Sequence, residues 1–484
     1  MRFNLRLIGN ILGLLLFLNG SFILLCIPFS IYYNEPWLPI LASGLITSAA
    51  GAVLWYLTKK NKNKELRKKD GYLIVTLGWF FMSLFGTLPF VLSGAIPDFT
   101  DAFFETISGF TTTGASILTD IESTPKGILF WRSLTQWIGG MGIIVLAVAI
   151  LPLLGIGGMQ LFIAEAPGIS PDKMKPRIKD VAKRLWLIYL GLTFAETLLL
   201  MAGGMTFFDS INHGLTTMAT GGFSTKNASV AHYDSAYIQY VIIAFMFLAG
   251  TNFTITYYGL KGKFRKVWEN EEFRMYIIIV SLLAVIISFF VFSHDWAGFE
   301  KSFRDSLFQV VSVITTTGYV TADYTTWAPF VTIIFFLLMF LGASAGSTAG
   351  GIKVVRHTLL FKNSFLEMKR QLHPSAVIPV RLNNSAVSRD ITYNVLAFVM
   401  IYLLTFSVGV FLISFTGEDF NTTLGAVATT LGNIGPGLGE VGPVNNFASI
   451  TPFGKWVLSF LMLLGRLELF TVLILFNPNF WKKY

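Results

Sequence analysis

The sequence predicts an all-α polytopic membrane protein in which two N-terminal spans precede four parallel repeats. Each repeat is a span, a pore helix, a filter run and a second span, and the four are arranged with pseudo-fourfold symmetry around one central pore. Three observations predict this fold: an apolar composition, ten apolar segments, and four short Thr- and Gly-rich runs at equivalent places. Hydrophobic residues make up 54% of the 484 and charged residues only 13%, whereas about a quarter of a soluble domain is charged.

Ten segments are apolar enough to cross a bilayer, which takes about 20 residues of helix. In chain order they are residues 5–27, 38–57, 72–92, 131–153, 185–205, 237–257, 275–292, 329–342, 391–415 and 456–476. They divide the chain into an N-terminal two-span hairpin with its basic loop (1–70) and four repeats (71–165, 166–270, 271–370 and 371–484). Because each repeat holds two full crossings, all four are expected to share one orientation.

Basic residues gather in alternate loops, at 59–69, 173–184, 261–274 and 353–389, and at both chain ends. The positive-inside rule places these loops and both termini in the cytoplasm, and ten spans satisfy that parity. The opposite loops carry mostly acids, such as Asp98, Asp120 and Glu440, and would weakly concentrate cations. Membrane topology accounts for the basic loops, so the net charge of +9 does not indicate a nucleic-acid partner.

Four short runs end in Gly at equivalent places of the four repeats. They are Thr111, Thr112, Thr113 and Gly114; Ala219, Thr220, Gly221 and Gly222; Thr315, Thr316, Thr317 and Gly318; and Gly432, Asn433, Ile434 and Gly435. Such a run suits a loop whose carbonyl oxygens replace the water shell of an ion, because Gly accepts backbone angles that a side chain forbids. A small-residue patch for close helix packing is the alternative for any single run. Four equivalent runs favour a filter around an aqueous pore, since irregular backbone at membrane depth must line water or be buried in protein.

Thirteen residues before each of these glycines stands a good helix N-cap: Asp101, Asp209, Asp305 and Thr422. The stretches that follow, 102–110, 210–218, 306–314 and 423–430, are too short to span a bilayer. They predict re-entrant helices whose C-termini point inward and favour a cation. Surface amphipathic helices are the alternative.

The second span of repeat 3 has about thirteen apolar residues and then a Gly/Ser run, so it cannot cross as a plain helix. The run predicts an intramembrane gating loop at 342–353, with the residues Gly342, Ser344, Gly346, Ser347, Thr348, Gly350, Gly351 and Lys353. Tight helix packing is the alternative. For Gly139, Gly140 and Gly142 in repeat 1, we expect close helix packing and not a flexible loop.

Arg466 and Glu468 lie in the last span, where charge is expensive and usually faces a cavity or a partner. Two residues apart, they do not share a helix face, so they are not expected to pair only with each other. Arg466 either sets a positive barrier in the pore, as part of the gate, or forms a structural ion pair, for instance with Glu196.

These residues resemble the Trk/Ktr/HKT superfamily of potassium transporters, and its Trk-type potassium uptake membrane subunit in particular. The resemblance covers essentially the whole chain. It depends on the four glycines that end the runs, on G-A-S-A-G-S-T-A-G-G-I-K at 342–353, and on L-G-R-L-E at 464–468.

The resemblance implies a homodimer with one pore per protomer and K⁺ dehydrated by filter carbonyls. It also implies a gate made of the intramembrane loop and Arg466, and a cytosolic, TrkA-like nucleotide-binding ring. Sodium-conducting plant relatives have Ser at the first filter position, so Gly114 implies a preference for K⁺. Ala219, Gly221 and the fourth run depart from T-T-T-G, and we therefore expect K⁺ permeation with less than tight exclusion of Na⁺.

We expect monovalent cation uptake across the plasma membrane (the bacterial inner membrane), with K⁺ as the transported ion and no cofactor on this chain. The alternative is an H⁺- or Na⁺-coupled symporter on the same scaffold. A membrane enzyme is disfavoured because the spans offer few catalytic groups beyond Glu196, Arg466 and Glu468. No Gly-rich phosphate motif follows a predicted strand, so nucleotide control is expected on another chain. Segment 356–389 docks a partner or is a plain linker.

Overall fold

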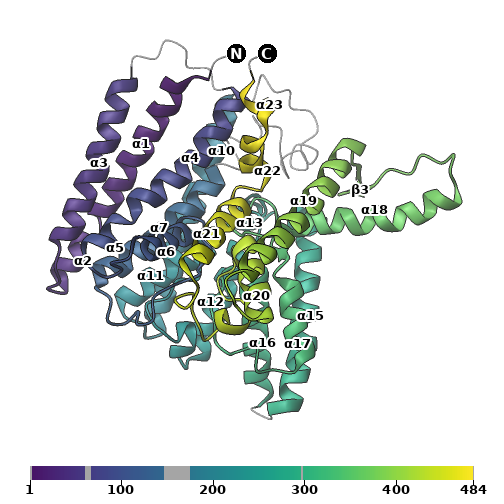
Figure 1. The fold of residues 1–484 in the computed structure, drawn as a ribbon. Coiled ribbons are helices and arrows are strands. Elements are labelled where there is room, and N and C mark those ends of the chain that lie inside the picture. The colour runs from purple at the N-terminus through teal and green to yellow at the C-terminus, as the bar shows by residue number, and fades with distance from the viewer. Residues whose placement is uncertain (1–2, 60–66, 146–174, 296–297, 483–484) are drawn as a thin grey trace.

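The computed structural model describes residues 3–59, 67–145, 175–295 and 298–482. It is mostly helical, with two short pairs of strands (Figure 1). The N-terminal hairpin consists of α1 (Leu5–Leu24), α2 (Ile27–Tyr32) and α3 (Leu38–Thr58). Small residues let α1 and α3 touch backbone to backbone: a Cβ on Gly13 would lie 2.6 Å from the Trp55 amide nitrogen, and one on Gly20 would lie 2.6 Å from that of Ser48. This is the close packing that small residues provide in membranes.

The helices and strands of the four predicted repeats follow in order. Repeat 1 has α4 (Lys68–Gly86), α5 (Leu88–Leu92), α6 (Phe99–Phe110) and α7 (Lys126–Val145); repeat 2 has α10 (Lys175–Ala202), α11 (Phe207–Met218), η3 (Ser229–His232), α12 (Ala236–Ala249), α13 (Phe253–Leu260) and α14 (Phe264–Glu269). Repeat 3 has α15 (Glu271–Asp295), α16 (Phe299–Ile314), α17 (Pro329–Leu338), β1 (Leu341–Gly342), β2 (Ile352–Lys353) and α18 (Val354–Leu372). Repeat 4 has β3 (Arg381–Leu382), β4 (Ser385–Ala386), α19 (Arg389–Ser414), α20 (Phe420–Gly432), η4 (Gly439–Val441), α21 (Pro452–Arg466), α22 (Phe470–Leu473), η5 (Ile474–Phe476) and α23 (Pro478–Trp481).

Six helical stretches within the described residues are long and apolar enough to cross a membrane, or eight if each of two bent pairs is one span. The predicted spans 237–257 and 456–476 are wrong as continuous helices. The first bends by 113° between α12 and α13, and the second by 110° between α21 and α22. Asn252 caps the new helix α13 by accepting a hydrogen bond from the Thr254 amide. Glu468 and Leu469, which follow α21, have φ of 57° and 45°, so the chain cannot continue as a right-handed helix there. Residues 146–153 of the predicted span 131–153 lie outside the described residues.

The four short helices exist, but they start earlier than the sequence predicted. Asp98, Thr206 and Asp419 are the true N-caps of α6, α11 and α20, and each accepts a hydrogen bond from the amide three residues on. The predicted caps Asp101, Asp209 and Thr422 are those third residues, within the first turn of each helix. Asp305 lies two turns inside α16, which begins after Gly298. A carboxylate in the first turn also complements the helix dipole, which is why it imitates a cap in the sequence.

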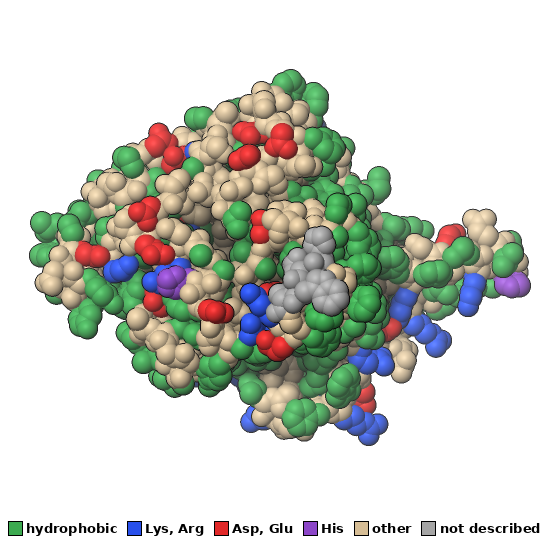
Figure 2. Space-filling model, turned by 90° about the horizontal axis from the view of Figure 1, so that it is seen from below, with side chains coloured by type: hydrophobic (Ala, Val, Ile, Leu, Met, Phe, Trp, Pro, Cys, Tyr) green, Lys and Arg blue, Asp and Glu red, His purple; other side chains and the backbone are tan. Residues whose placement is uncertain are grey.

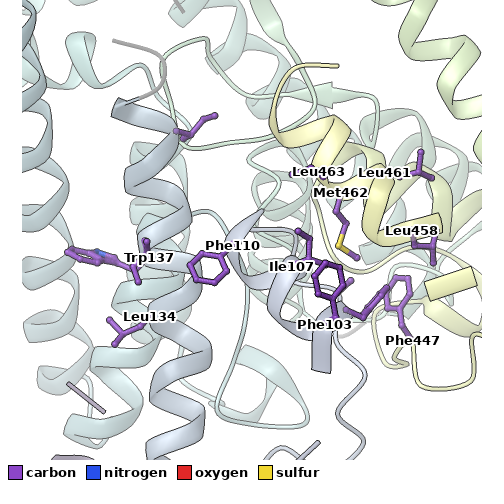
Figure 3. Packing of buried hydrophobic residues seen from close by; sticks show 14 of the residues in the cluster. Phe103, Ile107, Phe110, Leu134, Trp137, Phe447, Leu458, Leu461, Met462 and Leu463 are labelled. Atoms are coloured by element: carbon purple, nitrogen blue, oxygen red, sulfur yellow. The ribbon is translucent and has the colours of Figure 1, made fainter. Parts of the chain in front are cut away.

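The short helices are held by buried side chains of the neighbouring long helices. Figure 3 shows Phe103, Ile107 and Phe110 of α6 between α7, which carries Leu134 and Trp137, and the residues of α21. Near the outer end of α6, Asp101 accepts a hydrogen bond from Lys455 of α21 at 2.6 Å. This packing therefore fixes the end of α6, where the first Gly-ended run begins.

Candidate ion-binding and gating site

All four Gly-ended runs have the same backbone conformation. The second residue of each run is left-handed, with φ of 51° at Thr112, 53° at Thr220, 57° at Thr316 and 56° at Asn433. The closing residues Gly114, Gly222, Gly318 and Gly435 have φ of 82°, 76°, 77° and 103°. The third residue of each run does not have a positive φ. A left-handed β-branched residue is costly, so three such threonines in equivalent places indicate a shape that the surrounding fold imposes.

The amide groups of these runs point back into their own short helices. In the first run the Thr112 and Thr113 amides donate to Gly109 and Ser108 at 2.9 and 2.8 Å. The third run repeats this pattern from Thr316 to Val313 and from Thr317 to Ser312, at 3.0 and 2.9 Å. The second and fourth runs have the equivalent bonds at 2.8–3.3 Å. Because the donors are used on the helix side, the carbonyl groups of the runs are turned away from it.

The four runs contact one another in cyclic order. A Cβ on Gly114 would overlap the carbonyl oxygen of Gly221; one on Gly222, that of Thr317; and one on Gly318, that of Ile434. The cycle closes at Gly435, whose Cβ would lie 2.9 Å from the oxygen of Thr113. The structure thus brings the predicted filter residues of all four repeats together, through contacts that only glycine permits.

A glutamine that the sequence analysis missed explains the departure at the second run. The Gln136 amide donates to Gly221 O at 2.6 Å and accepts from the Phe223 amide at 3.1 Å. A Cβ on Gly221 would overlap this side chain. Gln136 therefore occupies the space that a threonine side chain would need, and Gly221 is required for that reason. The only signal in the sequence was one amide side chain within an apolar segment.

We expect Gln136→Leu to lower the free energy of unfolding by about 2 kcal/mol, because it leaves the buried Phe223 amide without a partner. The shift of the denaturation midpoint of the purified chain in detergent measures this. Gln371→Leu, at an exposed position near the end of α18, is the control. If the two variants have equal denaturation midpoints, the hydrogen bonds of Gln136 do not stabilise the second run.

Two further side chains connect the runs across repeats. The Tyr319 hydroxyl, directly after the third run, lies 2.5 Å from Thr216 Oγ1 of α11. The Asn433 amide donates to Thr113 Oγ1 at 3.0 Å and to Met462 O at 2.9 Å. Asn433 thus ties the fourth run to the first and to α21, although its own sequence is unlike T-T-T-G.

The predicted gating loop is seated against three of the repeats. The Gly350 amide donates to Thr316 Oγ1 of the third run at 2.7 Å. The Thr348 hydroxyl donates to Met218 O, at the end of α11, at 3.0 Å. A Cβ on Gly350 would lie 2.5 Å from Gly432 O of the fourth run. A two-residue parallel ladder between β1 and β2 closes the base of the loop.

Two buried cations hold the carbonyl groups of this loop. Arg466 donates from Nη1 to Thr348 O at 2.7 Å and from Nη2 to Gly139 O at 3.1 Å. Lys353 donates to Ala349 O, and to Gly350 O at 3.2 Å. Arg466 is 2% exposed, so its bonds form away from bulk water and are strong.

The ion pair between Arg466 and Glu196 that the sequence left open is wrong. Arg466 binds carbonyls, and neither carboxylate oxygen of Glu196 has a hydrogen-bond partner in the described part of the chain. Glu468 instead pairs with Arg356 at 2.5 Å. The sequence analysis also missed Glu272, which accepts from the Ala345 amide of the loop at 2.7 Å. These partners lie far apart in the chain, so no local spacing could indicate them.

The glycines of α7 pack closely, as expected from the sequence. A Cβ on Gly139 would overlap Phe110 O, and one on Gly140 would lie 2.9 Å from the Ala219 Cα. Gly139 has a second role that packing did not predict, because its carbonyl accepts from Arg466. One helix, α7, thus contacts the end of α6, the second run and the arginine.

The chain is similar to known proteins over nearly its whole length. The family described as TrkH, cation transport protein, matches residues 39–483. Among curated proteins, the chain is 43% identical to the Trk system potassium uptake protein TrkH of Salmonella typhimurium and 34% identical to TrkG of Escherichia coli K12, over 99% of each chain in both cases. The crystal structure of the potassium transporter TrkH from Vibrio parahaemolyticus superposes with a TM-score of 0.90 at 39% identity, covering 99% of this chain and 100% of that one. The chain is a multi-pass membrane protein and belongs to the TrkH family of cation transport proteins.

Proposed function

We propose that this chain carries K⁺ into the cell along a channel-like path through the ring of four Gly-ended runs. The observation that carries the proposal is the cyclic contact of these runs, each with its amides turned back into a short helix. Carbonyl oxygens in such a ring replace the hydration shell of an alkali metal ion. The short helices α6, α11, α16 and α20 direct their partial negative C-termini at the same place. The names of the full-length relatives support K⁺ as the ion.

Electrostatics favours entry from the face opposite the termini (Figure 2). Exposed acids lie on the loops of this face, among them Asp98, Asp120, Glu122, Asp419 and Glu440. Hydrogen bonds from Ser123 lower the pKa of Asp120, and hydrogen bonds from Thr422 lower the pKa of Asp419, so both remain charged at neutral pH. A membrane potential that is negative inside adds about 2.3 kcal/mol per charge per 100 mV. Cations are therefore concentrated at this entrance and drawn inward.

The loop 342–353 and Arg466 form the gate of this path. In the conformation described, the loop is hydrogen-bonded to the ends of α11 and α12 and to the third run, and Arg466 donates to its Thr348 carbonyl. An arginine below the ring also places a positive charge on the route of a cation. Withdrawal of the loop opens the path. Regulation by a cytosolic, TrkA-like nucleotide-binding ring and assembly as a homodimer in the plasma membrane, with cytoplasmic termini, complete the proposal.

Uptake of ⁸⁶Rb⁺ into proteoliposomes tests the function. The purified chain should catalyse uptake that excess K⁺ suppresses. Uptake no greater than in empty vesicles, with and without the cytosolic partner, would contradict the proposal. Because the family relation does not depend on this assay, the failure would concern the ion path and not the fold.

Proton-coupled symport is a second candidate, and Glu196 is the observation that favours it. This carboxyl of α10 is fully buried, and both its oxygens lack a hydrogen-bond partner among the described residues. A lone ionisable group at membrane depth is often a proton site. For the passive path we expect the reversal potential at a fixed K⁺ gradient to stay unchanged when the pH on one side is varied. A pH-dependent shift that disappears in Glu196→Gln would instead establish coupling through this residue.

A further inference from the structure

A polar cavity of about 920 Å³ lies on the side of the molecule that carries the basic loops. Its walls come from α13, α14 and the start of α15 on one side, and from α18 and the β3–β4 hairpin on the other. Five basic side chains line it: Arg265, Lys266, Arg274, Lys362 and Arg381. The lining acids are Glu269 and Glu271. The cavity is therefore a site of net positive charge.

Both acids of this cavity are already paired. Glu269 accepts from Arg265 at 2.8 Å, and Glu271 is paired with Lys362. Across the described residues, Lys266, Arg274 and Arg381 form no salt bridge, and all three are exposed. Three cations remain directed at one polar space, which is the arrangement that recognises a phosphate-bearing anion.

The walls of the cavity are fixed by hydrogen bonds. The Glu271 amide donates to Asn383 Oδ1 at 2.7 Å, and the Asn383 amide donates back to Glu271 Oε2 at 3.1 Å. This reciprocal pair ties the turn of the β3–β4 hairpin to the first residue of α15. Lys362 also donates to Arg381 O at 2.9 Å and thereby fixes α18 to the same hairpin. The three cations are thus presented by connected elements.

The short helix α14 beside the cavity has the character of a membrane-surface element. Phe264 and Trp268 are 63% and 58% exposed, while Val267 between them is buried against the protein. Leu260, at the end of α13, is 66% exposed. Aromatic side chains of this kind lie at the level of the lipid headgroups. The polar cavity and this apolar edge are adjacent, and together they match an amphiphile with an anionic head.

We propose that this cavity binds the phosphodiester headgroup of an anionic membrane lipid, with the acyl chains lying against Phe264 and Trp268. Basic pockets between membrane helices bind such headgroups through charge and hydrogen bonds. The inference depends on the membrane location of the chain and not on its ion path.

Native mass spectrometry of the delipidated full-length chain tests this proposal, with dioleoyl phosphatidylglycerol and dioleoyl phosphatidylcholine added in separate samples. Phosphatidylglycerol should be retained in preference, and less so as salt is raised. The variant Lys266→Gln/Arg274→Gln/Arg381→Gln should weaken its retention by about tenfold or more. The control Arg6→Gln/Lys59→Gln/Lys369→Gln, which removes equal charge at exposed positions elsewhere, should retain it like the parent chain.

Two further measurements distinguish binding of the lipid from binding of other compounds that carry a phosphate. Phe264→Ser/Trp268→Ser should lower the retention of phosphatidylglycerol, because the acyl chains lose their contacts. Glycerol 1-phosphate alone should bind much more weakly than the lipid. Equal retention of the two lipids, equal loss in both triple variants, or glycerol 1-phosphate binding as tight as that of the lipid would each overturn the proposal. The proposal would also be overturned if Lys266→Gln/Arg274→Gln/Arg381→Gln retained phosphatidylglycerol like the parent chain and lost only the binding of a protein partner.

Discussion

Replacing Arg466 by Ala should raise ⁸⁶Rb⁺ uptake through the purified chain, by up to about 100-fold. The guanidinium donates to Thr348 O at 2.7 Å and to Gly139 O at 3.1 Å, and so holds the loop 342–353 in place. Only the bond to Thr348 O reaches the loop, and a charge-assisted bond of this kind stabilises the seated loop by about 1.5–3 kcal/mol. Losing up to about 3 kcal/mol shifts the balance toward the withdrawn loop by up to about two powers of ten. The variant also removes a positive charge from the path of the cation.

Three comparisons decide whether this increase comes from the gate. Arg466→Lys keeps the charge but loses the fork of two bonds, so it should give a smaller increase. Deletion of residues 346–349 should raise uptake by a similar amount, and the two changes together should give no further increase, because both release the same contact. Arg304→Ala removes another buried arginine, which pairs with Glu300, and should leave uptake unchanged. Equal uptake in Arg466→Ala and the parent chain would remove the gate assignment.

The parts of this site that the sequence predicted are those with a local cause. A positive φ at the end of each run needs glycine, so Gly114, Gly222, Gly318 and Gly435 are visible as a repeated letter at constant spacing. The loop 342–353 is visible because ten residues of Gly, Ser, Ala and Thr cannot complete an apolar helix. Both inferences need only the properties of the residues themselves.

The parts that the sequence did not predict depend on distant partners or on a single bend. Gln136, Arg356 and Glu272 act on residues 73 or more positions away, and a single sequence taken by itself shows no such pairing. The bends in the predicted spans 237–257 and 456–476 do not interrupt the apolar pattern of the sequence. The mean hydropathy of a segment averages over the two or three residues that turn the chain. Leu469, between α21 and α22, has φ of 45°, a conformation that its side chain disfavours and only the fold enforces.

Replacing Gly114 by Ser should lower the permeability ratio of K⁺ to Na⁺ by about tenfold. A Cβ at this position would overlap Gly221 O, so the serine must displace a carbonyl of the neighbouring run. Strain of about 1–3 kcal/mol at such a site is enough to change the ring geometry on which ion discrimination depends. Reversal potentials of reconstituted protein between K⁺ and Na⁺ solutions measure the ratio.

The control for this variant separates backbone strain from contact with the ring. Gly94 has φ of 73°, close to the 82° of Gly114, but a Cβ there would meet nothing within 4 Å. Gly94→Ser therefore carries a similar cost of the left-handed region without moving a carbonyl, and we expect its permeability ratio to equal that of the parent chain. If both serine variants shift the ratio equally, a general loss of stability explains the effect. If neither does, the contact between Gly114 and Gly221 does not set ion discrimination, and the ring of four runs is not the filter.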